Sequence, residues 1–113
     1  MKAAMSGWRV QRISAMVLAV CVTVHLITMI AVAHGGLSAG AILARLHGNV
    51  VWGLFYAAFV LAAAAHVPVG LRRIAEEWLG WRGASVFAVS VLVGLMLAVA
   101  GLRAVFALTG GPL

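Results

Sequence analysis

The chain has little charge, and nearly all of it is of one sign. Only 9% of its 113 residues are charged, with 2 acidic residues against 8 lysines and arginines, while 65% are hydrophobic. So few polar side chains cannot cover a soluble globule, which predicts an integral membrane protein. The basic residues do not gather on a polar domain, so we expect them to act as topology signals and not to bind nucleic acid.

Cysteine is almost absent. The single cysteine, Cys21, lies inside an apolar run. The chain therefore has no disulfide framework and no cysteine-ligated metal or iron–sulfur centre. It also lacks a flavin or nucleotide fingerprint. We infer that it cannot oxidise a soluble substrate alone.

Three apolar segments are long enough to cross a membrane. They cover about residues 13–33, 50–71 and 84–108, and a hydrocarbon layer of roughly 30 Å needs about 20 helical residues. Lipid offers no partner to backbone amides, and the segments lack the alternation of barrel strands. We predict an all-α, integral membrane three-helix bundle, with helices at about 10–33, 48–74 and 83–108 in a single membrane-anchor domain, 1–113.

The basic residues predict the orientation of the bundle. Most lie toward one side (Lys2, Arg9, Arg12, Arg72, Arg73 and Arg82), whereas Arg45 and Arg103 lie near the other. By the positive-inside rule the N-terminus and the 72–82 loop are cytoplasmic, and we expect a multi-pass protein of the bacterial cytoplasmic membrane. As an alternative, the first segment with Ala31-Val32-Ala33 resembles a signal peptide. Its apolar run is longer than the usual stretch of about 7–15 residues, which favours a retained helix.

The second segment carries an ionisable residue in an alanine-rich apolar run. This residue is His66, and an imidazole in hydrocarbon is costly enough to suggest a ligand or a proton path. At about 3.6 residues per helical turn, Gly70, Arg73 and Glu77 return to the same face as His66. These four residues therefore define one candidate functional face.

The pattern around His66 is typical of a b-type haem site. Gly70 leaves bare backbone beside the imidazole, where a flat macrocycle can lie, and Arg72 and Arg73 stand where anionic propionates can be paired. His66 is then the axial ligand of the haem iron. Pro68 is expected to kink the helix or to free a carbonyl near Ala64. The alternative is that His66 only hydrogen-bonds a neighbouring helix and that the arginines are interfacial anchors.

Two motifs resemble a known family. The run from His66 to Glu77 resembles the signature of the cytochrome b membrane-anchor subunits of succinate dehydrogenase and fumarate reductase. In that signature a haem-ligating histidine is followed four residues later by glycine, then by an arginine and a final acid. The 11–15 run, Gln-Arg-Ile-Ser-Ala, resembles the family's His-Arg-x-Ser-Gly. The resemblance covers most of the chain.

The resemblance implies a role for each matching residue. His66 matches the axial haem ligand, Arg72 the basic residue near the propionates, and Arg12 the arginine near both haem and quinone. The candidates for quinone binding are Arg12, Ser14, Trp8, Glu77 and Trp78.

Several positions depart from the family pattern. In the first motif, Gln11 replaces a histidine and Ala15 replaces a glycine. Trp8 stands where one branch has a quinone-binding serine, Trp78 where the family has a tyrosine, and Arg73 where some relatives have a histidine. The haem assignment therefore transfers better than the quinone site.

The resemblance also implies the biological role. The chain is expected to be a haem b-containing anchor subunit of a succinate:quinone oxidoreductase, respiratory complex II, that docks flavoprotein and iron–sulfur subunits. Electrons would pass to ubiquinone or menaquinone. The sequence leaves open whether this is the first or the second anchor and in which direction electrons flow.

The depth of the histidines predicts a second anchor chain. His66 lies roughly 9 Å from Arg72 along its helix, and His25 lies roughly 20 Å from Arg12 along the first. Histidines at such different depths do not bind opposite faces of one haem, so the other iron ligand is expected from another chain. His25 either binds an outer haem or faces a neighbouring helix.

Two other classes of function remain as alternatives. One is a haem-free structural anchor of a membrane-bound dehydrogenase. The other is a small cation or multidrug transporter, which is disfavoured because neither acidic residue, Glu76 or Glu77, lies within an apolar core.

Overall fold

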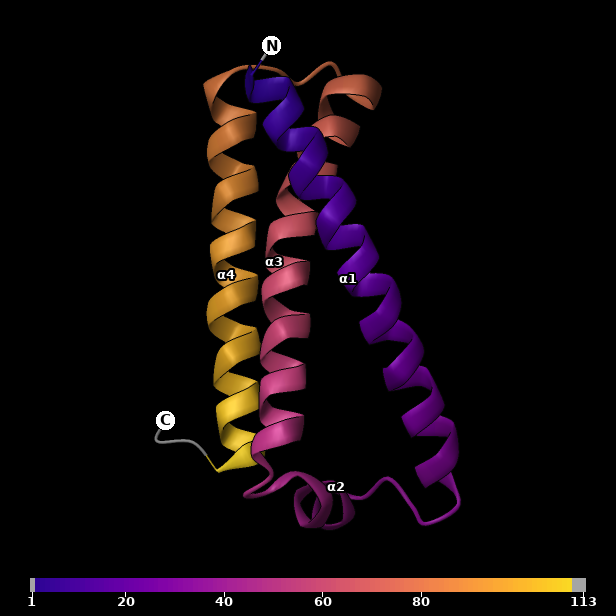
Figure 1. The fold of residues 1–113 in the computed structure, drawn as a ribbon. Coiled ribbons are helices and arrows are strands. Elements are labelled where there is room, and N and C mark those ends of the chain that lie inside the picture. The colour runs from indigo at the N-terminus through magenta and orange to yellow at the C-terminus, as the bar shows by residue number, and fades with distance from the viewer. Residues whose placement is uncertain (1, 111–113) are drawn as a thin grey trace.

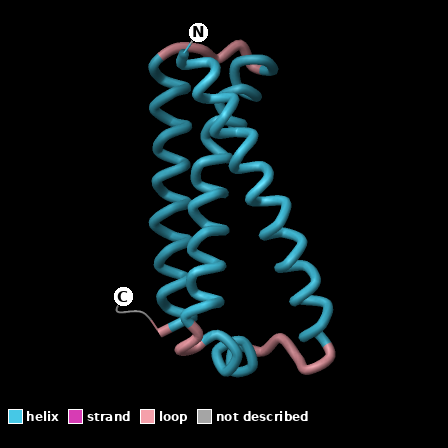
Figure 2. The backbone as a smooth tube through the Cα atoms, viewed as in Figure 1, coloured by secondary structure: helices cyan, strands magenta, loops and turns pink. Residues whose placement is uncertain are grey.

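A computed structural model describes the backbone of residues 2–110 and the side chains of residues 7–110. Throughout this part of the chain the regular structure is helical, comprising α1 (Lys2–Ala33), α2 (Ala39–Leu46), α3 (Val50–Trp78) and α4 (Ala84–Thr109). Figure 2 shows the helices and the short loops that join them. The three long helices are apolar enough to cross a membrane. The predicted all-α membrane protein with three spans is therefore confirmed.

Two of the helices are longer than the apolar segments suggest. α1 begins at Lys2 and not near residue 10, and α3 continues to Trp78 and not to about residue 74. α3 starts where the Asn49 side chain accepts a hydrogen bond from the Trp52 N–H. It ends where the N–H groups of Leu79 and Trp81 both donate to the Ala75 carbonyl, with Gly80 at a positive φ of 64°.

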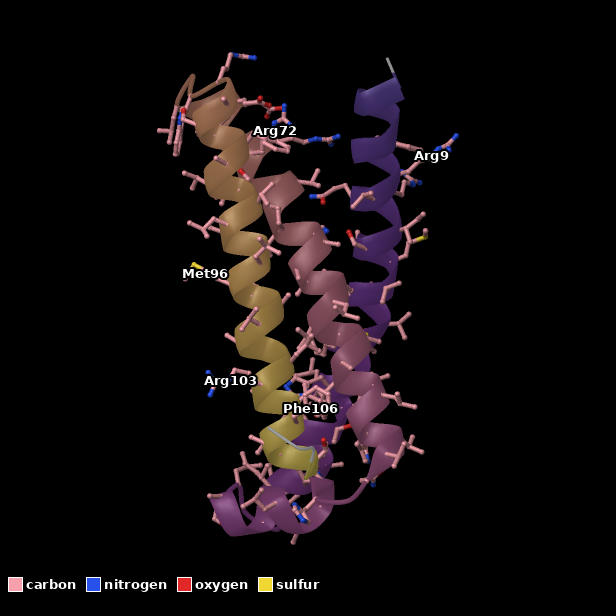
Figure 3. All side chains as sticks on the ribbon, turned by 90° about the vertical axis from the view of Figure 1, so that its left-hand side faces the viewer. Arg9, Arg72, Met96, Arg103 and Phe106 are labelled. Carbon is pink, nitrogen blue, oxygen red and sulfur yellow. The ribbon has the colours of Figure 1, made fainter. Side chains whose placement is uncertain are left out.

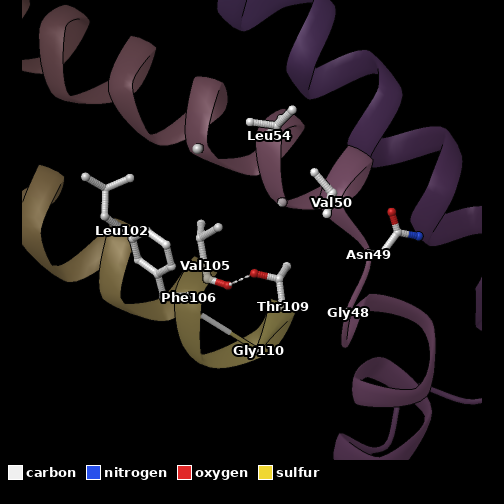
Figure 4. A pocket seen from close by; sticks show the side chains of 11 residues that line it. Gly48, Asn49, Val50, Leu54, Leu102, Val105, Phe106, Thr109 and Gly110 are labelled. Atoms are coloured by element: carbon white, nitrogen blue, oxygen red, sulfur yellow. Dashed lines mark hydrogen bonds between the residues drawn. The ribbon is translucent and has the colours of Figure 1, made fainter. Parts of the chain in front are cut away.

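The loop between the first two spans contains a helix of its own. Ser38 caps α2 by accepting a hydrogen bond from the Ala41 N–H at 3.2 Å. At its other end the Gly48 N–H donates to the Thr109 carbonyl at 2.9 Å. A hollow of about 460 Å³ between the start of α3 and the end of α4 lies beside this contact (Figure 4). The α2–α3 turn is therefore tied to the last turn of α4.

The long helices form a bundle that is tight on one side and splayed on the other. Figure 1 shows α3 and α4 side by side, whereas α1 crosses α3 near the N-terminus and leans away toward α2. The N-terminus and the α3–α4 loop share one end, which we call the basic end because Arg9, Arg12, Arg72, Arg73 and Arg82 lie there. The other end, with α2, is the α2 end. The Lys2 side chain lies outside the described residues.

Two glycines of α4 let α3 approach closely. Pro68 lies inside an unbroken α3, although it removes one helical N–H and leaves the Ala64 carbonyl without its partner. A Cβ on Gly94 would overlap Pro68 Cγ and lie 3.0 Å from the Ala64 oxygen, and two turns on a Cβ on Gly101 would overlap Val60. Small residues at such positions are the usual means of close helix packing in membranes. The freed carbonyl, expected near Ala64, thus faces Gly94.

Replacing Gly94 with alanine is expected to lower the free energy of unfolding by about 1–3 kcal/mol, because overpacking a tight contact has a cost of this size. The measurement is thermal denaturation of the detergent-solubilised complex. Gly7→Ala is the matched control, since a Cβ there meets nothing within 4 Å while both changes gain helix propensity. A G94A protein as stable as the G7A protein would contradict this account of the α3–α4 contact.

Candidate functional site

His66 meets Ser14 where α1 crosses α3. The His66 Nδ1 lies 3.1 Å from Ser14 Oγ, and Ser14 is only 6% exposed. The Ser14 hydroxyl also donates to the Gln11 carbonyl at 3.1 Å. We assign its single proton to this bond, so that toward His66 the hydroxyl oxygen accepts. This network assigns the hydrogen to Nδ1 and leaves a lone pair on Nε2.

The free Nε2 makes His66 a suitable metal ligand. No hydrogen bond to Nε2 is formed by the part of the chain that the structure describes. Histidines that bind metals usually donate their other ring N–H to a fixed acceptor, which sets the tautomer and the orientation of the ring. Ser14 provides such an acceptor. The described residues contain no group of three or more His, Cys, Asp or Glu side chains able to hold a metal ion.

Gln11 lies against the backbone that the sequence predicts to be bare. Gly70, one turn from His66, does face α1, but a Cβ there would lie 3.1 Å from Gln11 Nε2. The Gln11 Oε1 is buried and has no hydrogen-bond partner among the described residues. A buried acceptor without a donor is uncommon in folded proteins. No hydrogen bond from a described residue therefore holds the Gln11 amide oxygen in this place.

A groove with two cationic groups lies beside this cluster. It has a volume of about 430 Å³ and is lined by Trp8, Gln11, Arg12, Ala15, Met16 and Ala19 of α1 with Arg73 of α3. The Arg12 guanidinium lies 5.4 Å from the centre of the Trp8 ring. Neither Arg12 nor Arg73 forms an ion pair with a described residue. The groove is suited to an anion or to an oxygen that gains negative charge.

Arg72 points to a different helix. Its Nε lies 3.4 Å from Glu76 Oε2, and its guanidinium lies 5.4 Å from the centre of the Phe87 ring of α4. Figure 3 places Arg72 at the basic end, across the bundle from Arg9. Glu77 is exposed and Trp78 is 80% exposed at the end of α3. The structure thus brings together Trp8, Arg12 and Arg73, but not Arg72, Glu77 or Trp78.

His25 lies at a different depth from His66. Its Nδ1 is 3.1 Å from the Tyr56 hydroxyl, and its ring meets Phe59 edge-on. Tyr56 precedes His66 by ten residues, or about 15 Å along α3. Of the two alternatives for His25, the structure shows it facing a neighbouring helix.

Comparison with known proteins identifies the family. The model of the succinate dehydrogenase/fumarate reductase transmembrane subunit matches residues 1–102. The chain belongs to this family. The resemblance seen in the 11–15 and 66–77 motifs is thereby confirmed. Searches of curated proteins and of solved structures gave no match.

The sequence did not reveal how the transmembrane subunit holds His66. Ser14 was predicted only as a quinone ligand, and Gln11 only as a departure from the family pattern. Both contacts, Ser14 with His66 and Gln11 with Gly70, depend on where α1 crosses α3. The spacing of residues within one helix does not predict that crossing point. The sequence did contain one signal of this contact. Gln11 and Ser14 are polar and lie one helical turn apart, which is typical of a membrane helix face that packs against another helix.

Ser14→Ala is expected to lower the free energy of unfolding by about 0.5–1.5 kcal/mol, because it removes the acceptor of the His66 N–H. Thermal denaturation of the solubilised complex measures this. Ser90→Ala is the matched control, since Ser90 is 3% exposed and its hydroxyl has no partner among the described residues. Removing that hydroxyl should leave stability unchanged or raise it. Equal losses in both variants would contradict the assigned hydrogen bond.

Proposed function

We propose that this transmembrane subunit is the haem b-carrying membrane anchor of a succinate:quinone oxidoreductase in a bacterial cytoplasmic membrane. The observation that supports it best is the His66 ring, whose Nδ1 is bonded to Ser14 while Nε2 has no partner among the described residues. In this proposal Nε2 would hold the haem iron. The second ligand comes from another anchor chain, because His25 is committed to Tyr56 at another depth.

The residues around His66 have distinct tasks in this proposal. When bound, the haem supplies one-electron transfer between the soluble subunits and the quinone. Ser14 is a positioning residue that holds the imidazole. Gln11 moves away from Gly70 to make room for the haem, and the cationic group of Arg12 pairs with a propionate at the basic end.

The groove beside α1 is the proposed quinone site. A guanidinium of Arg12 or Arg73 can donate to a quinone carbonyl oxygen as negative charge develops there, and Trp8 provides a flat apolar wall. Ser14 is committed to Gln11 and His66, so its hydroxyl is less suited to this task than predicted from sequence. Glu77 and Trp78, exposed at the end of α3, are available to relay protons from water or to contact a docked subunit.

The basic end is the proposed docking face for the flavoprotein and iron–sulfur subunits. It carries most of the basic residues of the chain, and its orientation toward the cytoplasm follows from the positive-inside rule. With the N-terminus in the cytoplasm, the groove opens on the side from which electrons arrive. This arrangement keeps the haem ligand, the quinone groove and the docking face within a few helical turns.

A haem-free structural anchor is the second candidate function. It is favoured by one observation, namely that Gln11 lies against Gly70, where a macrocycle would otherwise rest. In that case His66 would serve only to join α3 to α1.

The test is the visible difference spectrum of the purified complex, dithionite-reduced minus oxidised. Reduced b-type bands are expected in the natural protein and are expected to vanish in His66→Ala. His25→Ala should retain them, because His25 bonds to Tyr56 about 15 Å away along α3. A featureless spectrum of a fully assembled natural complex would show the anchor to be haem-free.

Arg73→Gln is expected to slow electron transfer from succinate to a quinone by about tenfold or more, the value of one hydrogen bond from a charged donor. Arg72→Gln should change it little, because Arg72 is turned toward Glu76 and Phe87. Both rates are measured against an artificial acceptor that takes electrons from the soluble subunits. Equal effects of the two changes on quinone reduction would place the quinone outside the groove.

A further inference from the structure

A second hollow lies at the α2 end, far from His66. It has a volume of about 350 Å³, and all four helices contribute to its walls, including Met29, Ile42, Val60 and Leu108. Most of its polar groups are already paired. His25 is bonded to Tyr56, and the Thr109 hydroxyl donates to the Val105 carbonyl. Arg45 is the exception, since its Nε is buried without a hydrogen-bond partner among the described residues.

Arg45 stands between this deep hollow and a shallower one. The shallower hollow has a volume of about 290 Å³ and lies at the α1–α2 turn, beside Gly35, Gly36 and Leu37. Ile42 and Arg45 line both spaces. One is apolar and extends into the bundle as far as His25, whereas the other lies at the level where the membrane spans end. A molecule that fills both must have an apolar chain and a head at the membrane surface.

The charge of Arg45 indicates the chemistry of that head. The chain has two acidic residues, Glu76 and Glu77, and both lie at the basic end. From the start of α3 at Val50 to Glu76 is about 39 Å along the helix, so neither carboxylate can reach Arg45. A partly buried guanidinium without a counter-ion is unfavourable. An anionic head is therefore preferred over a neutral one such as a quinone ring.

We propose that the transmembrane subunit binds an anionic phospholipid at the α2 end. An acyl chain occupies the deep hollow beneath α2, the phosphate pairs with the Arg45 guanidinium, and the rest of the head lies beside the Gly35–Leu37 turn. Guanidinium and phosphate match in geometry as well as in charge. The position agrees with the fold, because α1 leans away from α3 and α4 toward this end and α2 spans the gap (Figure 1). The lipid fills the hollow that residues of all four helices line.

The test is the phospholipid retained by the purified, detergent-washed complex, extracted and quantified by mass spectrometry. Arg45→Gln is expected to lose a phospholipid for each copy of this chain. Arg103→Gln is the matched control, since Arg103 also lies toward the α2 end but points away from the bundle (Figure 3). It should retain the lipid. Size-exclusion chromatography establishes that each variant complex is assembled.

A second variant tests the apolar part of the site independently of charge. Ala104 lines the deep hollow, and Ala104→Phe should displace the acyl chain with Arg45 intact. Full retention of lipid in R45Q or in A104F would overturn the proposal. Equal losses in R45Q and R103Q would also overturn it, since they indicate a general attraction of headgroups. The proposal would also be overturned if the complex retained a quinone in place of a phospholipid and lost that quinone in R45Q.

Discussion

The hydrogen bond from His66 to Ser14 is the contact on which the candidate site depends. It joins α3 to α1 where the two helices cross, and it lies in a region where lipid offers no competing partner. Polar contacts between membrane helices contribute about 0.6–2 kcal/mol. The energy is modest, but the bond also decides the tautomer of the ring. With the Ser14 proton assigned to the Gln11 carbonyl, the imidazole carries its hydrogen on Nδ1 and presents Nε2 to its surroundings.

The α3–α4 pair is the frame that holds His66 in place. Gly94 receives Pro68 and the Ala64 carbonyl, so the turn of α3 around His66 is fixed against α4. At the α2 end, Gly48 and Thr109 tie the same two helices together. α1 crosses this frame at the basic end and diverges from it toward the α2 end. The two ends of the bundle therefore differ in structure. The basic end carries the haem and quinone candidates, and the α2 end carries the proposed lipid site.

The sequence predicted the parts of the structure that depend on one helix at a time. The three spans follow from apolar length, and helical periodicity places His66, Gly70, Arg73 and Glu77 on one face. The first three face α1, whereas Glu77 is exposed. Arg72, predicted to pair with a haem propionate, does not share this face, because adjacent residues on a helix differ in direction by about 100°. Its contacts with Glu76 and Phe87 bring it to α4.

Contacts between helices could not be predicted from spacing. The Ser14–His66 bond, the position of Gln11 on Gly70, and the fit of Pro68 against Gly94 all depend on where one helix crosses or abuts another. Gly94 and Gly101, two turns apart on α4, were a readable sign of a close helix contact. The sequence did not say which helix they receive, since α1 and α3 are both apolar enough to cross a membrane.

A cryo-electron microscopy map of the assembled complex tests the central claim most directly. The account predicts porphyrin density against α3, with His66 Nε2 at bonding distance from the iron, Nδ1 still on Ser14, and an axial ligand from another chain on the opposite face. A well-resolved map in which the His66 ring contacts only protein or lipid would contradict it.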